Sequence, residues 1–250
     1  MNKKQSLFAA TAALVFAGSS ALAADLPAKA PLYKAAPAYL SWTGFYIGGD
    51  IGGAWSRIDN SFVFPPPATL NQSRSTGIGG GFVGVQYQFS SLVLGVEGGV
   101  RTLFDRSLGS APCNPTGSCA AGFVMTSRLD DPIWTIGGRA GFAINNWMPY
   151  FTGGFASTAI AETVCTNASC PLERGRSRFD GGYLGGGLDF QFWTGWVAGV
   201  EYRHYDFRGR NVVPVFTSGS LDTNDTYHSH PKLDTVTFRL SYLFNWMRPY

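Results

Sequence analysis

The sequence predicts an all-β fold: a closed, antiparallel, eight-stranded up-and-down transmembrane β-barrel. Three observations predict this class. Charged residues make up only 14% of the 250-residue chain, whereas aromatic residues reach 15% and glycine occurs 32 times. Apolar residues alternate with small or polar residues at the two-residue period of strands. Tight turns and long loops alternate between these segments, which is the plan of an outer-membrane barrel.

The N-terminus is predicted to be a secretory signal peptide, residues 1–23. Two lysines precede a short apolar stretch from Leu7 to Phe16, and Ala21-Leu22-Ala23 forms a small-x-small cleavage site. Residues 24–42 are rich in alanine and proline and are expected to form an extended periplasmic leader. Removal of the signal peptide lowers Lys+Arg from 19 to 17, against 16 Asp+Glu. The mature chain is therefore almost neutral, and its charge gives no indication of nucleic-acid binding.

The barrel is expected to span residues 43–246 and to be followed by a short C-terminal extension, residues 247–250. Three pairs of successive strands start 16 residues apart, which leaves room for one strand and a tight turn. The other gaps contain loops of roughly twenty residues or more, and an even number of strands closes the sheet with both termini on one side. The eight strands are expected to begin near Gly44, Thr76, Leu92, Ile133, Pro149, Asp180, Trp196 and Asp234.

The stretch from Leu92 to Leu103 shows how the two faces of a strand differ. Leu94 and Val96 point to one face, which is expected to contact lipid, and Glu97 shares the other face with glycines. A soluble, lipocalin-like barrel would reverse these faces, and its polar coat should contain more than the three lysines of the mature chain. A transmembrane helix over the uncharged stretch from Ser75 to Val96 is disfavoured by its many glycines.

Aromatic residues gather near the expected strand ends, which predicts two girdles at the depth of the lipid headgroups. The girdle beside the tight turns and the C-terminus contains Tyr87, Phe89, Trp147, Tyr150, Phe192, Trp193, Trp196, Phe244 and Trp246. The girdle beside the long loops contains Trp55, Phe104, Trp134, Phe179 and Phe207.

The alternation assigns four acidic residues and four arginines to the inward face. An isolated charge inside a narrow barrel loses several kcal/mol of hydration free energy, so the charges are expected to pair. Glycines on the same face leave space for arginine side chains to meet carboxylates in bidentate geometry. The predicted result is a neutral network that plugs the lumen; the alternative is a water-filled lumen with solvated, unpaired charges. The eight residues are Asp50, Glu97, Asp189 and Glu201 with Arg101, Arg139, Arg203 and Arg239.

Four cysteines fall in two close pairs, Cys113 with Cys119 and Cys165 with Cys170. Both pairs lie in predicted extracellular loops of an exported chain, where oxidation is expected. Four cysteines allow three connectivities, and pairing within each loop is favoured because it needs only local closure. A metal site would favour the tighter C-x₂-C spacing.

Three arginines alternate at the end of the third long loop, at Arg174, Arg176 and Arg178. On an extended chain they share one face and could contact lipopolysaccharide phosphates through charge-assisted hydrogen bonds. The alternative is a solvated arginine loop.

Two further motifs suggest chemistry but favour plain structural interpretations. His228-Ser229-His230 could hold a metal or haem, or serve a hydrolase, yet a loop without a rigid third partner is a poor catalytic scaffold. Gly79 to Gly84 fits G-x-G-x-x-G, but no helix follows. We therefore expect no catalytic residues, no metal and no cofactor.

Several motifs resemble a known family. The segments are WTGFYIGG (Trp42 to Gly49), PYFTGG (Pro149 to Gly154), GGGLDF (Gly185 to Phe190), VEYRHYDF (Val200 to Phe207) and LDTVTFRLSYLF (Leu233 to Phe244). In this order they resemble the small outer-membrane barrels of alphaproteobacteria, the porin family or outer-membrane immunogenic proteins, which are related to OmpA-type and OmpX-type barrels. The resemblance implies Sec export to the outer membrane of a Gram-negative bacterium, with extracellular loops and periplasmic termini.

One departure from the family pattern concerns the C-terminus. Barrels of this kind commonly end in an aromatic residue that the barrel-assembly machinery recognises. Here Phe244 is followed by six residues, so either Phe244 or Tyr250 could be the assembly signal.

The expected function is non-enzymatic: an integral barrel with a structural and surface-display role in the cell envelope. The family label suggests a porin, but eight strands leave an interior just wide enough for side chains. A narrow porin for small solutes is therefore the second hypothesis, and a lipid-modifying outer-membrane hydrolase is the third. The expected partners are outer-membrane lipid, lipopolysaccharide and the assembly machinery.

Overall fold

The computed structural model describes most of the chain from residue 41 onward, within one compact unit that spans Leu40–Tyr250. The predicted signal peptide, residues 24–40 of the predicted leader, the segment 246–250 and three of the cysteines lie outside the described residues; Cys165 is placed by its backbone alone. No described helix is long and apolar enough to cross a membrane. The described ranges are 41–62, 68–112, 124–165, 173–213, 215–216 and 227–245.

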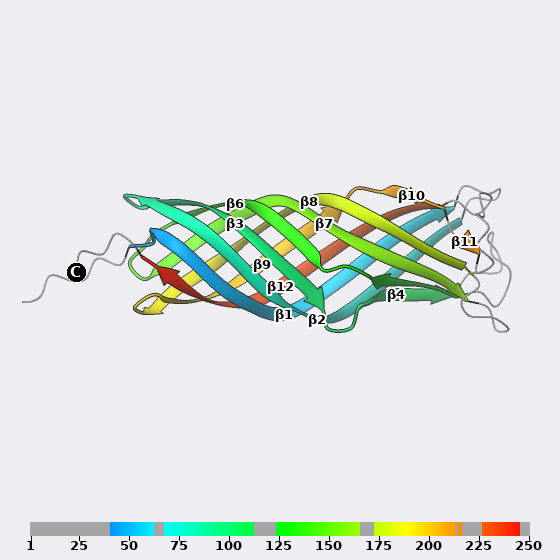
Figure 1. Cartoon of the computed structure of the whole chain (residues 1–250), viewed down its shortest axis with the longest axis horizontal. Coiled ribbons are helices and arrows are strands. Elements are labelled where there is room, and N and C mark those ends of the chain that lie inside the picture. Colours follow the sequence, from blue (N-terminus) through cyan, green and yellow to red (C-terminus); the bar gives the residue numbers. More distant parts are fainter. Residues whose placement is uncertain are drawn as a thin grey trace, which may run out of the picture. The chain divides into compact units, whose positions relative to one another are not determined.

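The described strands form one 12-stranded antiparallel sheet. Figure 1 shows the strands wound about one axis. Its long strands are β1 (Gly44–Phe62), β2 (Ala68–Phe89), β3 (Leu92–Leu103), β6 (Ile133–Phe142), β7 (Trp147–Cys165), β8 (Glu173–Trp193), β9 (Trp196–Phe207) and β12 (Tyr227–Phe244). The short strands are β4 (Ser107–Pro112), β5 (Val124–Leu129), β10 (Arg210–Val212) and β11 (Val215–Phe216).

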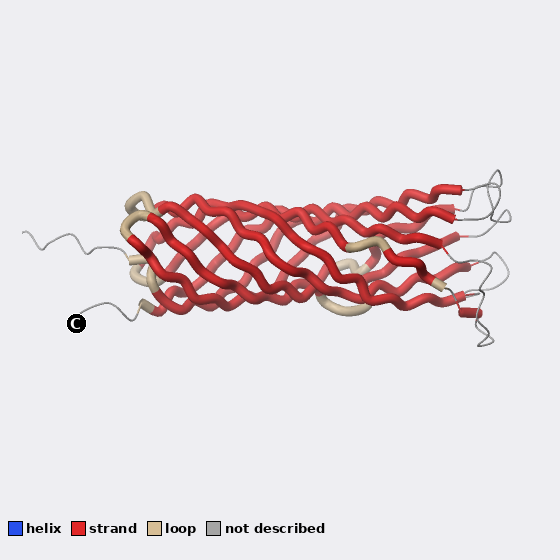
Figure 2. Tube along the Cα trace, turned by 90° about the horizontal axis from the view of Figure 1, so that it is seen from above, coloured by secondary structure: helices blue, strands red, loops and turns tan. Residues whose placement is uncertain are grey.

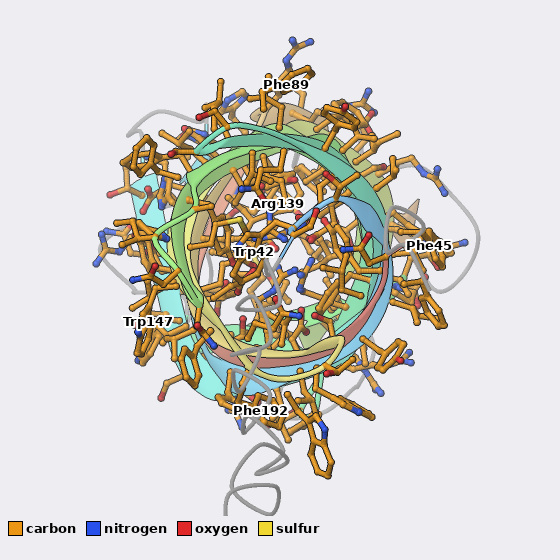
Figure 3. The ribbon with its side chains drawn as sticks, turned by 90° about the vertical axis from the view of Figure 1, so that its left-hand side faces the viewer. Trp42, Phe45, Phe89, Arg139, Trp147 and Phe192 are labelled. Carbon is orange, nitrogen blue, oxygen red and sulfur yellow. The ribbon has the colours of Figure 1, made fainter. Side chains whose placement is uncertain are left out.

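The long strands pair with their neighbours along the chain, which confirms the predicted antiparallel up-and-down arrangement. Pairing runs from β1 through β2, β3, β6, β7, β8 and β9 to β12, and β12 also pairs with β1. Viewed along the axis, the strands surround a lumen filled with side chains (Figure 3).

Several strands extend further toward the loops than the alternation predicts. β2 begins at Ala68 rather than near Thr76, and β8 begins at Glu173 rather than near Asp180. β1 and β12 pair without a break from Phe45↔Phe244 to Phe62↔Tyr227. Backbone pairing continues past the apolar belt, where outward positions become polar and the sequence no longer looks like a lipid-facing strand.

Three tight turns, at 90–91, 145–146 and 194–195, join successive long strands as predicted. Figure 2 shows turns gathered at one end of the strands. Ser90 (φ 57°), Asn145 (φ 55°) and Gly195 (φ 79°) adopt left-handed backbone in these turns. Left-handed residues match the twist of tight hairpins, and asparagine and glycine tolerate them well. We call this the turn end, and the other the loop end.

The outer face is apolar, as expected for contact with lipid. Ile51, Val96, Ile136 and Phe151 are all exposed there. Trp55, Phe104 and Trp134 are exposed toward the loop end, and Phe89, Trp147, Phe192 and Trp193 toward the turn end.

The predicted girdles were wrong at three positions. Tyr150, Phe179 and Phe207 are buried and point into the lumen. Each lies at an inward position of its strand. The alternation of the strand, and not the distance to its end, decides which face the side chain points to.

The lumen is packed with apolar side chains on both sides of its centre. Toward the turn end, Trp42, Phe82, Met148 and Leu243 belong to one buried cluster. A second cluster fills the lumen toward the loop end and includes Ile58. Trp42 lies in the mouth of the ring (Figure 3), where its backbone N–H donates to Gln88 Oε1 (2.8 Å) and its carbonyl accepts from Gln86 Nε2 (2.7 Å).

Candidate functional site: a charge network in the lumen

The structure brings together all eight charged residues that the sequence assigned to the lumen. Every one is buried, and the most exposed, Asp50, is only 7% exposed. They lie between the two apolar clusters and come from six different strands. Figure 3 shows Arg139 pointing into the ring.

Two glutamates and two arginines form the centre of the network. Glu97 Oε1 lies 2.6 Å from Arg203 Nη2, and Glu97 Oε2 lies 2.5 Å from Arg239 Nη2. Glu201 binds the same two arginines, at 2.6 Å from Arg203 Nε and 2.6 Å from Arg239 Nη1. Each carboxylate therefore contacts both guanidinium groups, and each guanidinium contacts both carboxylates.

Two further ion pairs flank this centre. Arg101 Nη2 lies 2.7 Å from Asp50 Oδ2, and Arg139 Nη2 lies 2.6 Å from Asp189 Oδ2. Longer contacts of 3.8 Å and 3.9 Å connect the same arginines to Glu201 and Glu97. Four carboxylates thus neutralise four guanidinium groups, so burial leaves no net charge in the centre of the lumen.

Aromatic side chains complete the network, and sequence reasoning missed their role. Tyr46 donates a 3.0 Å hydrogen bond to Glu97, and Tyr150 donates a 3.0 Å hydrogen bond to Glu201. The guanidinium carbon of Arg139 lies 3.9 Å from the centre of the Tyr150 ring, which is cation–π geometry. The sequence alternation could have indicated this role, because both tyrosines lie at inward positions of their strands, as the charged residues do.

Glycines allow the tyrosines to reach the glutamates across an intervening strand. Tyr46, Gly84 and Glu97 are directly opposite one another on β1, β2 and β3. A Cβ atom at Gly84 would overlap the end of the Tyr46 ring. The tyrosine crosses the backbone of β2 where there is no side chain, and its hydroxyl meets the carboxylate on the far side.

The same arrangement recurs in the second half of the chain. Tyr150, Gly187 and Glu201 are directly opposite one another on β7, β8 and β9, and a Cβ at Gly187 would lie 2.6 Å from the Tyr150 hydroxyl. The network therefore has two matching halves.

The other predicted site residues lie apart from this network. Arg176 Nε lies 2.5 Å from Asp130, and Arg176 and Arg178 both contact Asp131 at 3.2 and 3.6 Å. Both arginines are exposed on one face, and the side chain of their predicted companion Arg174 lies outside the described residues.

The histidine motif of β12 does not bring a serine and a histidine together. Ser229 is buried in the lumen, whereas His228 and His230 lie on the other face of the strand. His230 Nε2 contacts Asp206 at 2.7 Å on the outer surface. A hydrolase built on adjacent Ser229 and His230 is therefore disfavoured, because the alternation of the strand separates the two groups.

The two predicted assembly signals differ in what the structure describes. Phe244 ends β12 with an exposed ring that contacts Phe45 and Tyr242, whereas Tyr250 lies outside the described residues. Pairing of the cysteines likewise stays a prediction.

Comparison with known proteins agrees with this architecture. The family model described as "Outer membrane protein beta-barrel domain" matches residues 9–244. The chain belongs to this family. Family membership supports a location in the outer membrane of a Gram-negative bacterium.

Curated relatives in this family are outer-membrane immunogenic proteins, which confirms the resemblance in the sequence motifs. The chain is 31% identical to the 31 kDa outer-membrane immunogenic protein of Brucella melitensis, over 96% of this chain and 100% of the relative. It is 29% identical to the 25 kDa outer-membrane immunogenic protein of Brucella canis, over 90% of this chain and 96% of the relative.

One solved structure supports the fold alone. The outer membrane protease OmpT of Escherichia coli aligns with 80% of this chain and 97% of its own, at a TM-score of 0.50 and 9% identity.

Proposed function

We propose that the protein is a non-enzymatic, integral outer-membrane barrel with a structural and surface-display role, and that its lumen is closed. The membrane-embedded part is the apolar belt of the ring of eight long strands, and several of these strands continue beyond it toward the loop end. The short strands β4, β5, β10 and β11 extend the wall beyond the lipid-facing belt. The turn end faces the periplasm and the loop end faces the exterior, since short turns are periplasmic in barrels of this kind.

The observation that carries this proposal is the filled lumen. An apolar cluster with Trp42 occupies the turn end, the neutral charge network lies in the middle, and a second apolar cluster follows toward the loops. Breaking one buried ion pair to open a path would leave the partner charge uncompensated, at a cost of about 3–5 kcal/mol. The same packing holds the wall together and opposes transport.

Outer-membrane lipid, lipopolysaccharide and the barrel-assembly machinery are the proposed partners. The apolar outer face supports contact with outer-membrane lipid. Arg176 and Arg178 would contact lipopolysaccharide phosphates only in competition with Asp131, which already lies within 3.6 Å of both. Phe244 is the described candidate for recognition by the assembly machinery.

A narrow porin for small solutes is the alternative, and planar-bilayer recording separates it from the closed barrel. Purified protein whose folding has been verified by heat-modifiable gel mobility is expected to show negligible steady conductance, because buried side chains of the described residues pack the lumen on both sides of the charge network. Large, stable channels in the parent protein would favour the porin. The Glu97→Ala and Arg139→Ala variants serve as comparisons, since each removes one side chain of the network.

Protease treatment of intact cells tests the proposed orientation. Added protease is expected to cut between Ala111 and Asp131, at the loop end, and to spare the tight turn at Asn145-Asn146. Fragment masses from mass spectrometry identify the cut sites. Cleavage at the asparagine turn with the loop intact would reverse the orientation, and permeabilised cells control for access to the periplasm.

A further inference from the structure

The loop end of the lumen holds a buried carboxylate that is separate from the charge network. Glu162 lies on β7, seven residues beyond Phe155, the last large apolar side chain that is exposed among those described on that strand. It is therefore outside the lipid-facing belt. Its carboxylate accepts hydrogen bonds from the Tyr227 hydroxyl and, at 3.4 Å, from the Ser229 hydroxyl, both on β12.

Neutral polar side chains surround this carboxylate. Ser127 on β5 is directly opposite Glu162, and Asn60 on β1 is directly opposite Ser229. Asn60 is only 1% exposed and Ser127 is fully buried, at 0%. Within the described part of the chain, the Ser127 hydroxyl and both amide atoms of Asn60 have no hydrogen-bond partner. Since more than about 90% of buried polar groups have a partner, these groups are available to ligate a species bound between the strands.

No cation of the described residues faces Glu162. Gly175 is its register partner on β8, and the nearby charged side chains Arg128, Arg176 and His228 are exposed on the outer surface. Burial raises the pKa of Glu162 to about 8, although the hydrogen bond from Ser229 opposes this rise. The carboxylate thus lacks the compensation that arginines provide in the central network.

We propose that this layer binds one monovalent alkali cation, for example Na⁺, through the Glu162 carboxylate and the neutral oxygens of Asn60, Ser127 and Ser229. Oxygen atoms are the ligands that hard cations prefer. One positive charge neutralises the single carboxylate, whereas a divalent cation would leave a net buried charge. The cation takes the place of the carboxyl proton, so binding releases a proton when the site starts protonated.

Thermal unfolding of the full-length protein in detergent micelles tests this site. The midpoint is measured by gel mobility in NaCl and in N-methylglucamine chloride of equal ionic strength, because the bulky organic cation does not fit between the strands. At pH 9 the midpoint is expected to be higher in NaCl, since ligand binding to the folded state stabilises it. At pH 6 the difference is expected to shrink, because the proton occupies the carboxylate.

The pH dependence without sodium has a definite sign. A carboxyl whose pKa is raised on folding stabilises the folded state below its ordinary pKa, and this contribution is lost as the pH rises through about 8. In N-methylglucamine chloride the unfolding midpoint is therefore expected to fall as the pH rises from the ordinary pKa of a carboxyl group to about 8. Sodium is expected to restore it at high pH.

Glu162→Gln is expected to abolish the sodium response at both pH values. Asp234→Asn, at a carboxylate on the outer surface, is the matched control and is expected to keep the response. If Glu162→Gln does not fold, Ser127→Ala is expected to fold and to require more NaCl for the same shift. No sodium-specific shift in the parent, an unchanged response in both site variants, or stabilisation by CaCl₂ in preference to NaCl would overturn the proposal.

Discussion

Glu97→Ala is expected to lower the free energy of unfolding by about 3–5 kcal/mol, because it removes one member of a buried network and leaves the others unpaired. Glu97 contacts Arg203 and Arg239 at 2.6 and 2.5 Å and accepts a hydrogen bond from Tyr46. Without it, three carboxylates face four guanidinium groups in the middle of the lumen. Denaturant unfolding followed by tryptophan fluorescence and gel mobility measures the loss.

Two comparison variants separate the charge effect from the loss of packing. Glu97→Gln keeps the side-chain volume but removes the charge, so it is expected to recover only a part of the stability. Asp234→Ala removes a carboxylate that contacts Tyr202 and His204 on the outer surface. There the loss in the free energy of unfolding is expected to be about 1 kcal/mol or less. A loss below 1 kcal/mol in Glu97→Ala would mean that water, and not the arginines, compensates the charge.

The alternation of apolar and polar residues was sufficient to predict the charged residues of the lumen, but not the apolar and aromatic side chains that pack on both sides of them. A strand has only two faces, so a period of two assigns each residue to one of them. For this reason all eight network charges could be assigned to the inward face, and the structure places them buried. Their partners could not: Glu97 and Arg239 are 142 residues apart, and only the register of the pairing strands brings them into contact.

The errors have physical reasons of the same kind. Phe179 and Phe207 were assigned to a girdle because they lie near strand ends, but their inward parity places them in the core. The extension of β8 to Glu173 was missed because its outward positions carry arginines instead of apolar residues. Pairing of the backbone beyond the membrane does not require an apolar face, so the hydrophobic pattern ends before the strand does.

The second large effect on stability is expected at Gly84, which lies between Tyr46 and Glu97 in the sheet. It depends on the absence of a side chain at Gly84. Gly84→Ala is expected to lower the free energy of unfolding by about 1–3 kcal/mol through overpacking, because the new methyl group would occupy the space of the Tyr46 ring. The ring is buried and cannot move aside without losing its hydrogen bond to Glu97. A hydrogen bond to a charged group contributes about 1.5–3 kcal/mol, so the total loss is expected to approach that of Glu97→Ala.

A double-mutant cycle with Tyr46→Ala identifies the cause. In the Tyr46→Ala background the space over β2 is open, so Gly84→Ala is expected to cost less than about 1 kcal/mol there, and the coupling between the two positions is expected to be large. Gly81→Ala on the same strand is the matched control: its new Cβ would lie 3.6 Å from the Gly48 carbonyl oxygen, an ordinary contact distance. Equal losses at Gly81 and Gly84 would assign the effect to the strand backbone. A loss confined to Gly84 and suppressed by Tyr46→Ala would show that the glycine provides the path by which tyrosine reaches the buried glutamate.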